Sequence, residues 1–165
     1  MIHYRMHASP LGSLLLAATD RGLCGLYFEE HRHFNGPQGW QRMDDHPHLR
    51  LAAEQLDDYF AGRRREFALP LDLAGTPFQH KVWRQLQRIG YGATASYLLH
   101  ARAVGAERAV RAVGAAIGRN PLSIIIPCHR ILGSDGALTG YAGGLDRKRY
   151  LLALEAAGKV DNSGG

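Results

Sequence analysis

Apolar and polar positions at the start of the chain follow patterns typical of β-strands. Polarity alternates over residues 2–6, and two further apolar runs follow at 13–18 and 23–28, with turn-forming residues between the runs. We therefore expect three strands of a small antiparallel sheet. Residues 29–45 are polar, rich in His and without periodicity, which indicates a loop.

The pattern then changes to that of one amphipathic helix. Apolar residues recur at helical spacing across Leu49–Phe60, and Gly62 is expected to end the helix. The three arginines at 63–65 should be exposed, and residues 67–71 should form a short strand or an extended linker. Nothing in this half indicates a catalytic site, so residues 1–75 are predicted to be a small α+β support domain.

The second half is predicted to be mostly helical. A Thr-Pro pair at 76–77 provides an N-cap followed by Pro at the first helical position. Further helices are expected at 96–103 and, after a turn at Gly105, at 107–118. Two helices joined by a tight glycine-containing turn are the outline of a helix-turn-helix. Residues 76–165 are therefore predicted to form an α-helical domain with this motif.

The helix expected at 107–118 consists mainly of small residues, with arginine as its large polar side chain. Gly114 lowers helix stability, so another requirement must favour it. Close packing against a neighbouring helix is one explanation. Close approach to a nucleic acid, such as the narrow minor groove of DNA, is the other, and we favour it in combination with the residues described below.

Composition and charge narrow the class of protein. The chain has 165 residues, of which 45% are apolar, enough for one good core or two small ones. No apolar run could span a bilayer, the start lacks a signal-peptide pattern, and two cysteines do not make a disulfide framework. We expect a cytoplasmic protein that binds no membrane.

The charge is unevenly divided. Residues 1–76 contain 8 Lys and Arg against 10 Asp and Glu, whereas residues 77–165 contain 12 against 5. A basic half next to a mildly acidic one indicates a polyanionic partner for the basic half. Solvated arginines on helix surfaces would produce the same imbalance, so charge alone leaves both explanations open.

A candidate nucleophile follows an apolar β-branched run. Residues 123–126 are expected to be a buried strand that ends at a Pro-Cys-His-Arg sequence, 127–130. The adjacent His and Arg should make the surroundings of Cys128 electropositive and favour its thiolate. A buried, inert thiol is the alternative, and it is our interpretation of Cys24, which lies in an apolar strand.

The chain then passes through a glycine-rich loop into a last helix. Residues 140–144 lack the order of a phosphate-binding loop and are interpreted as the wall of a pocket. Asp146 is expected to cap the following helix, which carries Glu155. Because a buried carboxylate needs a partner, periodicity favours an exposed face for Glu155.

The segment from Gly75 to about Glu155 resembles the catalytic domain of the O6-alkylguanine-DNA alkyltransferases, also called methylated-DNA–protein-cysteine methyltransferases. The resemblance lies in ordered motifs: Gly75-Thr76-Pro77-Phe78-Gln79, Val82-Trp83, Tyr91-Gly92, Ser96-Tyr97, Arg111-Ala112-Val113-Gly114, Arg119-Asn120-Pro121, Ile126-Pro127-Cys128-His129-Arg130 and Thr139-Gly140-Tyr141-Ala142-Gly143-Gly144. Several ordered motifs over about half the chain make the resemblance specific.

The resemblance implies direct reversal of DNA damage. An alkyl group on O6 of guanine, or on O4 of thymine, would pass once to Cys128 without a cofactor. His129, reached through a water, and a buried Glu155 would form a proton relay, which contradicts the exposed face that periodicity favours for Glu155. Asn120 would tie the active-site turn to the preceding helix. Tyr97 would help to extrude the base and protonate the departing guanine.

The resemblance also implies how DNA is held. Arg111 would fill the space that the extruded base leaves, on a helix whose other DNA-binding residues are Ala112, Gly114 and Arg119. The pocket for the base would be lined by the residues Pro127, Tyr141, Ala142, Gly143 and Lys148. The expected partner is double-stranded DNA containing O6-alkylguanine, and the protein is expected to be a monomer.

Some features depart from the family pattern. Ala93-Thr94 stands where relatives often have Glu, Ile117 replaces a more usual Asn, and Ala142 stands where some relatives have Ser. The last two changes could alter contacts of the pocket or loop, so they leave the range of substrates open but not the reaction. Some relatives carry structural zinc in the N-terminal domain, but Cys24 is the only cysteine of that half, so we predict no metal.

Two other functions are compatible with parts of the pattern. A thiol hydrolase could use Cys128, His129 and Glu155 as a triad, although neighbours on an extended chain point to opposite sides. A DNA lesion-binding protein without catalysis is the second alternative. Relatives of that kind lack the acceptor cysteine, which this chain retains.

Overall fold

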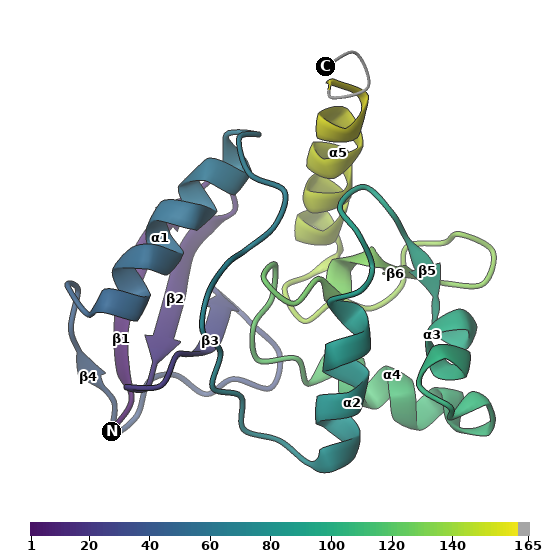
Figure 1. Cartoon of the computed structure of the whole chain (residues 1–165), viewed down its shortest axis with the longest axis horizontal. Coiled ribbons are helices and arrows are strands. Elements are labelled where there is room, and N and C mark those ends of the chain that lie inside the picture. Colours follow the sequence, from purple (N-terminus) through teal and green to yellow (C-terminus); the bar gives the residue numbers. More distant parts are fainter. Residues whose placement is uncertain (162–165) are drawn as a thin grey trace. The chain divides into compact units, whose positions relative to one another are not determined.

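The computed structural model describes residues 1–161, with side chains to residue 158 (Figure 1). Contacts divide the chain into two compact units, Met1–Ala74 and Gly75–Gly165. The last four residues of the predicted second domain, 162–165, lie outside the described part. No helix within the described residues is long and apolar enough to cross a membrane.

The first unit is a four-stranded sheet with one helix. Its elements are β1 (His3–Ser9), β2 (Gly12–Ala18), β3 (Leu23–Phe28), β4 (Gln41–Arg42) and α1 (Pro47–Phe60). The strand order is β3-β2-β1-β4, in which β1, β2 and β3 pair antiparallel and β4 pairs parallel with β1. The three predicted strands and the helix are confirmed, whereas β4 lies in a segment that was expected to be loop.

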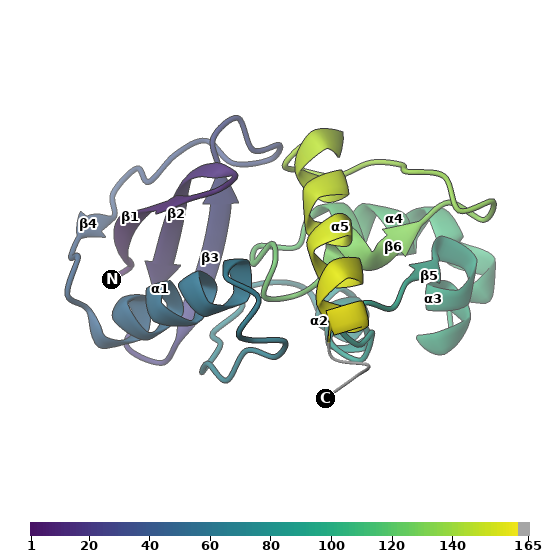
Figure 2. The ribbon, with the colours of Figure 1, turned by 90° about the horizontal axis from the view of Figure 1, so that it is seen from above.

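The core of this unit lies between the sheet and α1, which packs against β1 and β2 (Figure 2). The helix contributes one buried stripe, as its spacing predicts. The apolar side chains that are buried here are Leu14, Leu16, Leu26, Phe28, Leu49, Ala52, Ala53, Leu56 and Tyr59.

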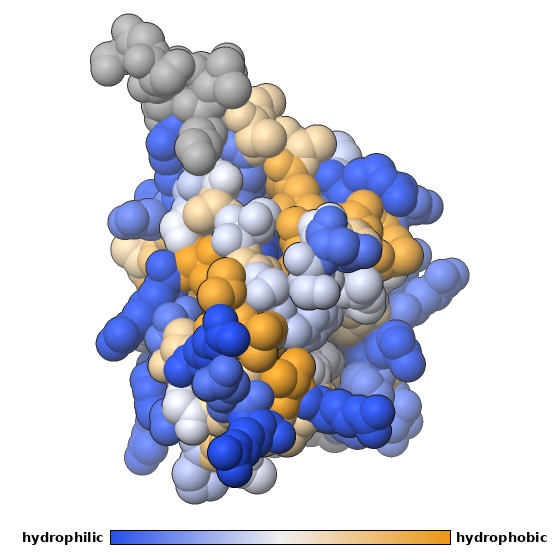
Figure 3. Space-filling model, turned by 90° about the vertical axis from the view of Figure 1, so that its right-hand side faces the viewer, coloured by the Kyte–Doolittle hydropathy of each residue, from blue (hydrophilic) through white to orange (hydrophobic). Residues whose placement is uncertain are grey.

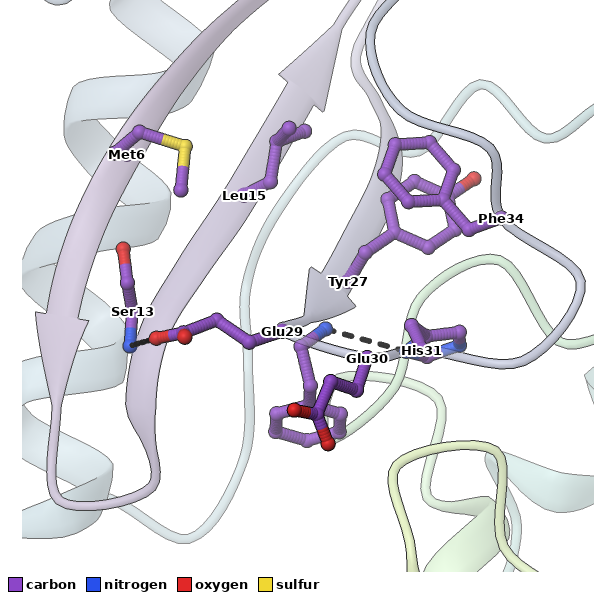
Figure 4. Close-up of a pocket in the computed structure, with 9 residues that line it drawn as sticks. Met6, Ser13, Leu15, Tyr27, Glu29, Glu30, His31 and Phe34 are labelled. Atoms are coloured by element: carbon purple, nitrogen blue, oxygen red, sulfur yellow. Dashed lines mark hydrogen bonds between the residues drawn. The ribbon is translucent and has the colours of Figure 1, made fainter.

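A segment after β3 folds back and forms a recess of about 270 Å³ (Figure 4). Phe34 stacks on Tyr27, with 3.8 Å between the ring centroids. Glu29 accepts a hydrogen bond from the backbone N–H of Ser13 at 3.0 Å, and His31 accepts one from the N–H of Phe28 at 3.2 Å. These contacts give the segment a defined position although its sequence has no periodicity.

The second unit is mainly helical. Its elements are α2 (Pro77–Leu86), β5 (Ala95–Ser96), α3 (Tyr97–Ala103), η1 (Glu107–Ala109), α4 (Val110–Gly118), η2 (Cys128–Arg130), β6 (Ile131–Leu132) and α5 (Leu145–Asp161). The start of α2 is a complete capping box, because Thr76 and Gln79 each bond the other's backbone N–H, at 3.1 and 3.0 Å. The strands β5 and β6 pair in parallel.

Three local predictions in this unit are wrong. Residues 123–126 are buried but form a turn, closed by a 2.8 Å hydrogen bond from the N–H of Ile126 to the carbonyl of Leu122. Burial alone does not distinguish a strand from a turn, since both exclude water. Residues 107–109 form a separate 3₁₀ turn before α4, and α5 begins at Leu145, so Asp146 lies in the first turn.

Candidate active site

The turn that precedes Cys128 is held by the side chain of Asn120. Its Nδ2 donates to the carbonyl of Ile126 at 2.8 Å, and its Oδ1 accepts from the N–H of Leu122 at 3.0 Å. Inside this turn Ile124 has φ +73°, a conformation that is costly for a β-branched residue. Asn120 follows Arg119, the C-cap of α4, so it joins the turn to that helix.

The thiol of Cys128 is buried, with 7% of the residue exposed. Burial raises its pKa, and a hydrogen bond from Asn120 and the positive charge of Lys148 only partly oppose that effect. The thiol is therefore protonated at neutral pH. The expectation that adjacent His129 and Arg130 would favour the thiolate is wrong, because burial outweighs their effect and the Arg130 guanidinium is paired with Glu155.

His129 and Glu155 form a buried pair. The Nε2 of His129 lies 2.7 Å from Oε2 of Glu155, and the two side chains are 0% and 1% exposed. Burial lowers the pKa of His129, while the hydrogen bond with Glu155 opposes the shift. A neutral ring must then donate its Nε2 proton to the carboxylate, which leaves the Nδ1 lone pair free. That Nδ1 atom has no hydrogen-bond partner within residues 1–161.

Arg130 binds the same carboxylate from the other side. Its Nε and Nη2 donate to the two oxygens of Glu155 at 2.8 and 2.9 Å, and its Nη1 donates to the carbonyl of Ile89. Burial alone would raise the pKa of Glu155, but hydrogen bonds from His129 and Arg130 hold it far below its ordinary value. The exposed face that periodicity favoured for Glu155 is therefore wrong.

Several residues of the predicted base pocket lie near the thiol. Pro127, Tyr141, Gly143 and Lys148 are buried, and Ala142 is half-buried. Lys148 extends its ammonium group to the carbonyls of the preceding loop, at residues 139 and 140. Burial lowers the pKa of Lys148 and raises that of Tyr141 well above its ordinary range, so the Tyr141 phenol is neutral.

Sequence reasoning missed two residues of this site. The buried hydroxyl of Ser123 opposes the rise in pKa of both Cys128 and Tyr141, so it lies close to both groups. Arg130 was interpreted only as a positive neighbour of the thiol. The signal that could have identified its partner was the carboxylate of Glu155 on an apolar helix, since a buried acid and a buried Arg satisfy each other.

The helix α4 has one buried face and one exposed face. Val113, Ala116 and Ile117 face the core, where the indole N–H of Trp83 donates to the carbonyl of Ala116 at 2.9 Å. The exposed residues are Arg111, Ala112, Ala115 and Arg119. Figure 3 looks onto the side of the molecule that carries α3 and α4, where hydrophilic side chains border apolar ones.

Gly114 lies beside Tyr97, the first residue of α3. A Cβ atom added at Gly114 would lie 3.7 Å from the Tyr97 ring, and one added at Gly140 would lie 3.8 Å from the Tyr97 hydroxyl. Both are ordinary contact distances, so packing within the protein does not require glycine in α4. The structure thus places Tyr97 between α4 and the loop that contains Gly140.

The chain matches two known domain families over nearly its whole length. The ribonuclease-like domain of 6-O-methylguanine DNA methyltransferase matches residues 2–73, and the DNA binding domain of 6-O-methylguanine DNA methyltransferase matches residues 77–157. The chain belongs to the 6-O-methylguanine DNA methyltransferase family. The predicted fold class, an α+β domain followed by a mostly α domain with a helix-turn-helix, is confirmed by this membership.

Individual relatives match nearly the whole chain. A methylated-DNA–protein-cysteine methyltransferase of Mycolicibacterium paratuberculosis is 49% identical over 94% of this chain and 93% of its own. The constitutive methylated-DNA–protein-cysteine methyltransferase of Bacillus subtilis is 44% identical over 94% and 96%. The crystal structure of Mycobacterium tuberculosis OGT in complex with DNA superposes with a TM-score of 0.88, at 46% identity and 94% coverage of both chains.

The structure sorts the predicted site residues of this methyltransferase-family chain into two groups. Cys128, Asn120, His129 and Glu155 are buried, as are most of the predicted pocket residues. Arg111 and Ala112 on α4, and Arg119 at its C-cap, are instead exposed. The first group suits chemistry on a buried thiol and the second suits contact with an external partner.

Proposed function

We propose that this chain is a methylated-DNA–protein-cysteine methyltransferase, which repairs O6-alkylguanine in double-stranded DNA by a single transfer to Cys128. The observation that carries the proposal is the buried pair of His129 and Glu155. His129 is the residue next to Cys128, in a chain that belongs to this family. An ionised carboxylate that fixes the tautomer of an imidazole is the arrangement of a general base.

The proposed chemistry begins with removal of the thiol proton. Because burial keeps Cys128 protonated, a base must take the proton when the substrate is in place. Nδ1 of His129 accepts it through an intervening water, and the carboxylate of Glu155 stabilises the imidazolium that forms. The relay therefore supplies a thiolate at the moment of attack and avoids the cost of burying one at rest.

The thiolate then attacks the alkyl carbon. A bond forms between Sγ of Cys128 and that carbon, the bond from the carbon to O6 breaks, and its electron pair remains on the guanine. The phenol of Tyr97 donates a proton to the departing base. The product is a thioether on Cys128, which water does not cleave, so each molecule should react once.

Access to O6 requires the nucleotide to leave the base stack, at a cost of a few kcal/mol. The exposed face of α4 suits the minor groove because Ala112 and Gly114 let the backbone approach the DNA closely. Arg111 inserts where the base has left, and Arg119 lies further along the same helix. The extruded base enters the space beside Tyr141 and Lys148, whose ammonium group fixes the loop carbonyls.

Mass spectrometry of the intact protein tests the reaction. After mixing with excess duplex containing O6-methylguanine, the protein mass should rise by one methyl group and then stay constant. Cys128→Ser should remain unmodified, whereas Cys24→Ser, the matched control, should react like the wild type. Methyl groups on Cys24 would contradict the proposal, and repeated turnover would favour a thiol hydrolase.

The role of Arg111 predicts a dependence on the form of the substrate. Arg111→Ala should slow transfer from duplex DNA by roughly 5- to 150-fold, as expected for loss of a specific contact worth about 1–3 kcal/mol. Transfer from the free base O6-benzylguanine should not change, because no stack has to be opened. Single-turnover rates on both substrates measure this difference.

Arg149→Ala is the control for the loss of one positive charge, since Arg149 is exposed and paired with Asp146. If Arg111 only contacted a phosphate, its loss would weaken binding to all DNA and reduce the salt dependence by about one charge. Equal slowing on the duplex and on the free base would contradict the role proposed for Arg111.

A further inference from the structure

Three side chains with metal-binding atoms converge in the first unit, away from any residue used above. His3, Asp20 and His46 each offer one ligand atom, and these atoms all lie within 4.8 Å of one another. The Nε2 of His46 lies 3.9 Å from Oδ1 of Asp20, and the rings of His3 and His46 have centroids 5.3 Å apart. The set contains two imidazoles and one carboxylate, and no cysteine.

The fold brings these residues together from three segments. His3 begins β1, and the antiparallel register pairs it with Ala18, the last residue of β2, so Asp20 lies at the same end of the hairpin. His46 is the N-cap of α1. The start of β1, the end of β2 and the start of α1 lie at one end of the unit (Figure 1).

Hydrogen bonding within the protein does not account for these polar atoms. The Nδ1 of His3 is buried and has no hydrogen-bond partner among the described residues. The 3.9 Å separation between His46 and Asp20 is too long for a hydrogen bond. Buried polar atoms are normally satisfied, so an unsatisfied one on a ring beside two other potential ligands points to a missing partner.

We propose that His3, Asp20 and His46 bind one divalent transition-metal ion, for which Zn²⁺ is the probe. Two imidazoles and a carboxylate suit ions of this class, whereas Mg²⁺ and Ca²⁺ prefer sites made of oxygen ligands. A fourth position filled by water would complete a tetrahedron. The proposal concerns the first unit alone and does not depend on alkyl transfer.

The geometry needs only a small adjustment. In a tetrahedral zinc site the ligand atoms are about 3.3 Å apart, given metal–ligand distances near 2.0–2.1 Å. The Asp20 side chain is 95% exposed and can rotate inward, whereas that of His46 is 7% exposed and already fixed. The ion would then tie the start of β1 and the hairpin end to the first turn of α1.

One hydrogen bond opposes binding. Nδ1 of His46 accepts from the N–H of His48 at 3.3 Å, which caps α1. Coordination through Nε2 places the ring proton on Nδ1, so this cap would be lost and the N–H of His48 would turn to solvent. The cap is a long hydrogen bond, and three metal–ligand bonds replace it.

Calorimetric titration of the reduced full-length protein with Zn²⁺ tests the site. We expect saturable binding of one equivalent and a rise in melting temperature with Zn²⁺. Asp20→Asn and His3→Gln should each weaken Zn²⁺ binding by at least about tenfold. Replacing a residue that only hydrogen-bonds to a metal ligand already weakens metal affinity by about 10- to 100-fold, so loss of a ligand should cost no less. The controls are Asp45→Asn, an exposed acid next to His46, and His7→Gln, and both should bind like the wild type.

Melting without metal checks that each variant folds. Asp20→Asn changes an exposed side chain, so it should melt at the wild-type temperature in chelator and lose only the gain from Zn²⁺. Absence of one-equivalent binding, or equal affinity in Asp20→Asn and wild type, would overturn the site. So would a thiolate-to-metal absorption band after titration with Co²⁺, because it would place the ion on a cysteine.

Discussion

Glu155→Gln should slow alkyl transfer by roughly a hundredfold or more, the range for loss of an acid–base partner. The substitution preserves the shape of the side chain but removes the charge that stabilises the His129 imidazolium. His129 would then be a weaker base towards the thiol of Cys128. Single-turnover rates measured against pH test this effect.

Members of one relay should not have additive effects. His129→Ala should slow transfer about as much as Glu155→Gln, and the double variant should be little slower than either. Asp146→Asn is the matched control, because it removes an exposed carboxylate from the same helix without touching the network. Wild-type rates in Glu155→Gln across the pH range would show that the carboxylate plays no part in the transfer.

The fold could be predicted from local patterns to a large extent. Strands at the start, a helix over Leu49–Phe60 and a Thr76 cap each depend on residues close in sequence, so spacing and capping chemistry were enough. The turn at 123–126 was missed because its hydrogen bonds come from Asn120, a side chain outside the apolar run. Periodicity indicates which residues are buried, but it does not indicate which groups form hydrogen bonds with their backbone.

The electrostatics of the site could not be predicted from sequence neighbours. The motif around Cys128 indicated the proposed nucleophile, but neighbours in sequence gave the wrong charge state for the thiol. The reason is that the charge of Arg130 is neutralised by Glu155, 25 positions away, and that burial outweighs the remaining field. Electrostatic environments depend on contacts between distant segments, which one sequence does not reveal.

The cluster of His3, Asp20 and His46 also depends on contacts between segments that are distant in the sequence. A count of cysteines predicted no metal in the first half. The ligand set proposed above lies at positions 3, 20 and 46, with no spacing typical of a metal motif. Only the register between β1 and β2 and the start of α1 bring these residues together.

The largest expected change in stability follows from the buried ion pair. Arg130→Met should reduce the free energy of unfolding by about 3–5 kcal/mol at neutral pH, because it leaves the charge of Glu155 buried without its bidentate partner. Arg149→Met is the control, since its pair with Asp146 is exposed and should contribute less than about 1 kcal/mol. Denaturant unfolding of the three proteins measures the difference.

Acid should reduce that difference. The folded pKa of Glu155 is depressed, so the stability that this carboxylate contributes is fully present above its unfolded pKa of about 4.3 and is lost as the pH falls. In Arg130→Met the depression is smaller, because the two hydrogen bonds from Arg130 to the carboxylate are gone, so less stability remains to be lost. The unfolding free energies of wild type and Arg130→Met should therefore converge between about pH 5 and pH 3. A difference that stays constant over this range would mean that Arg130 stabilises the unit through its packing and not through the charge of Glu155.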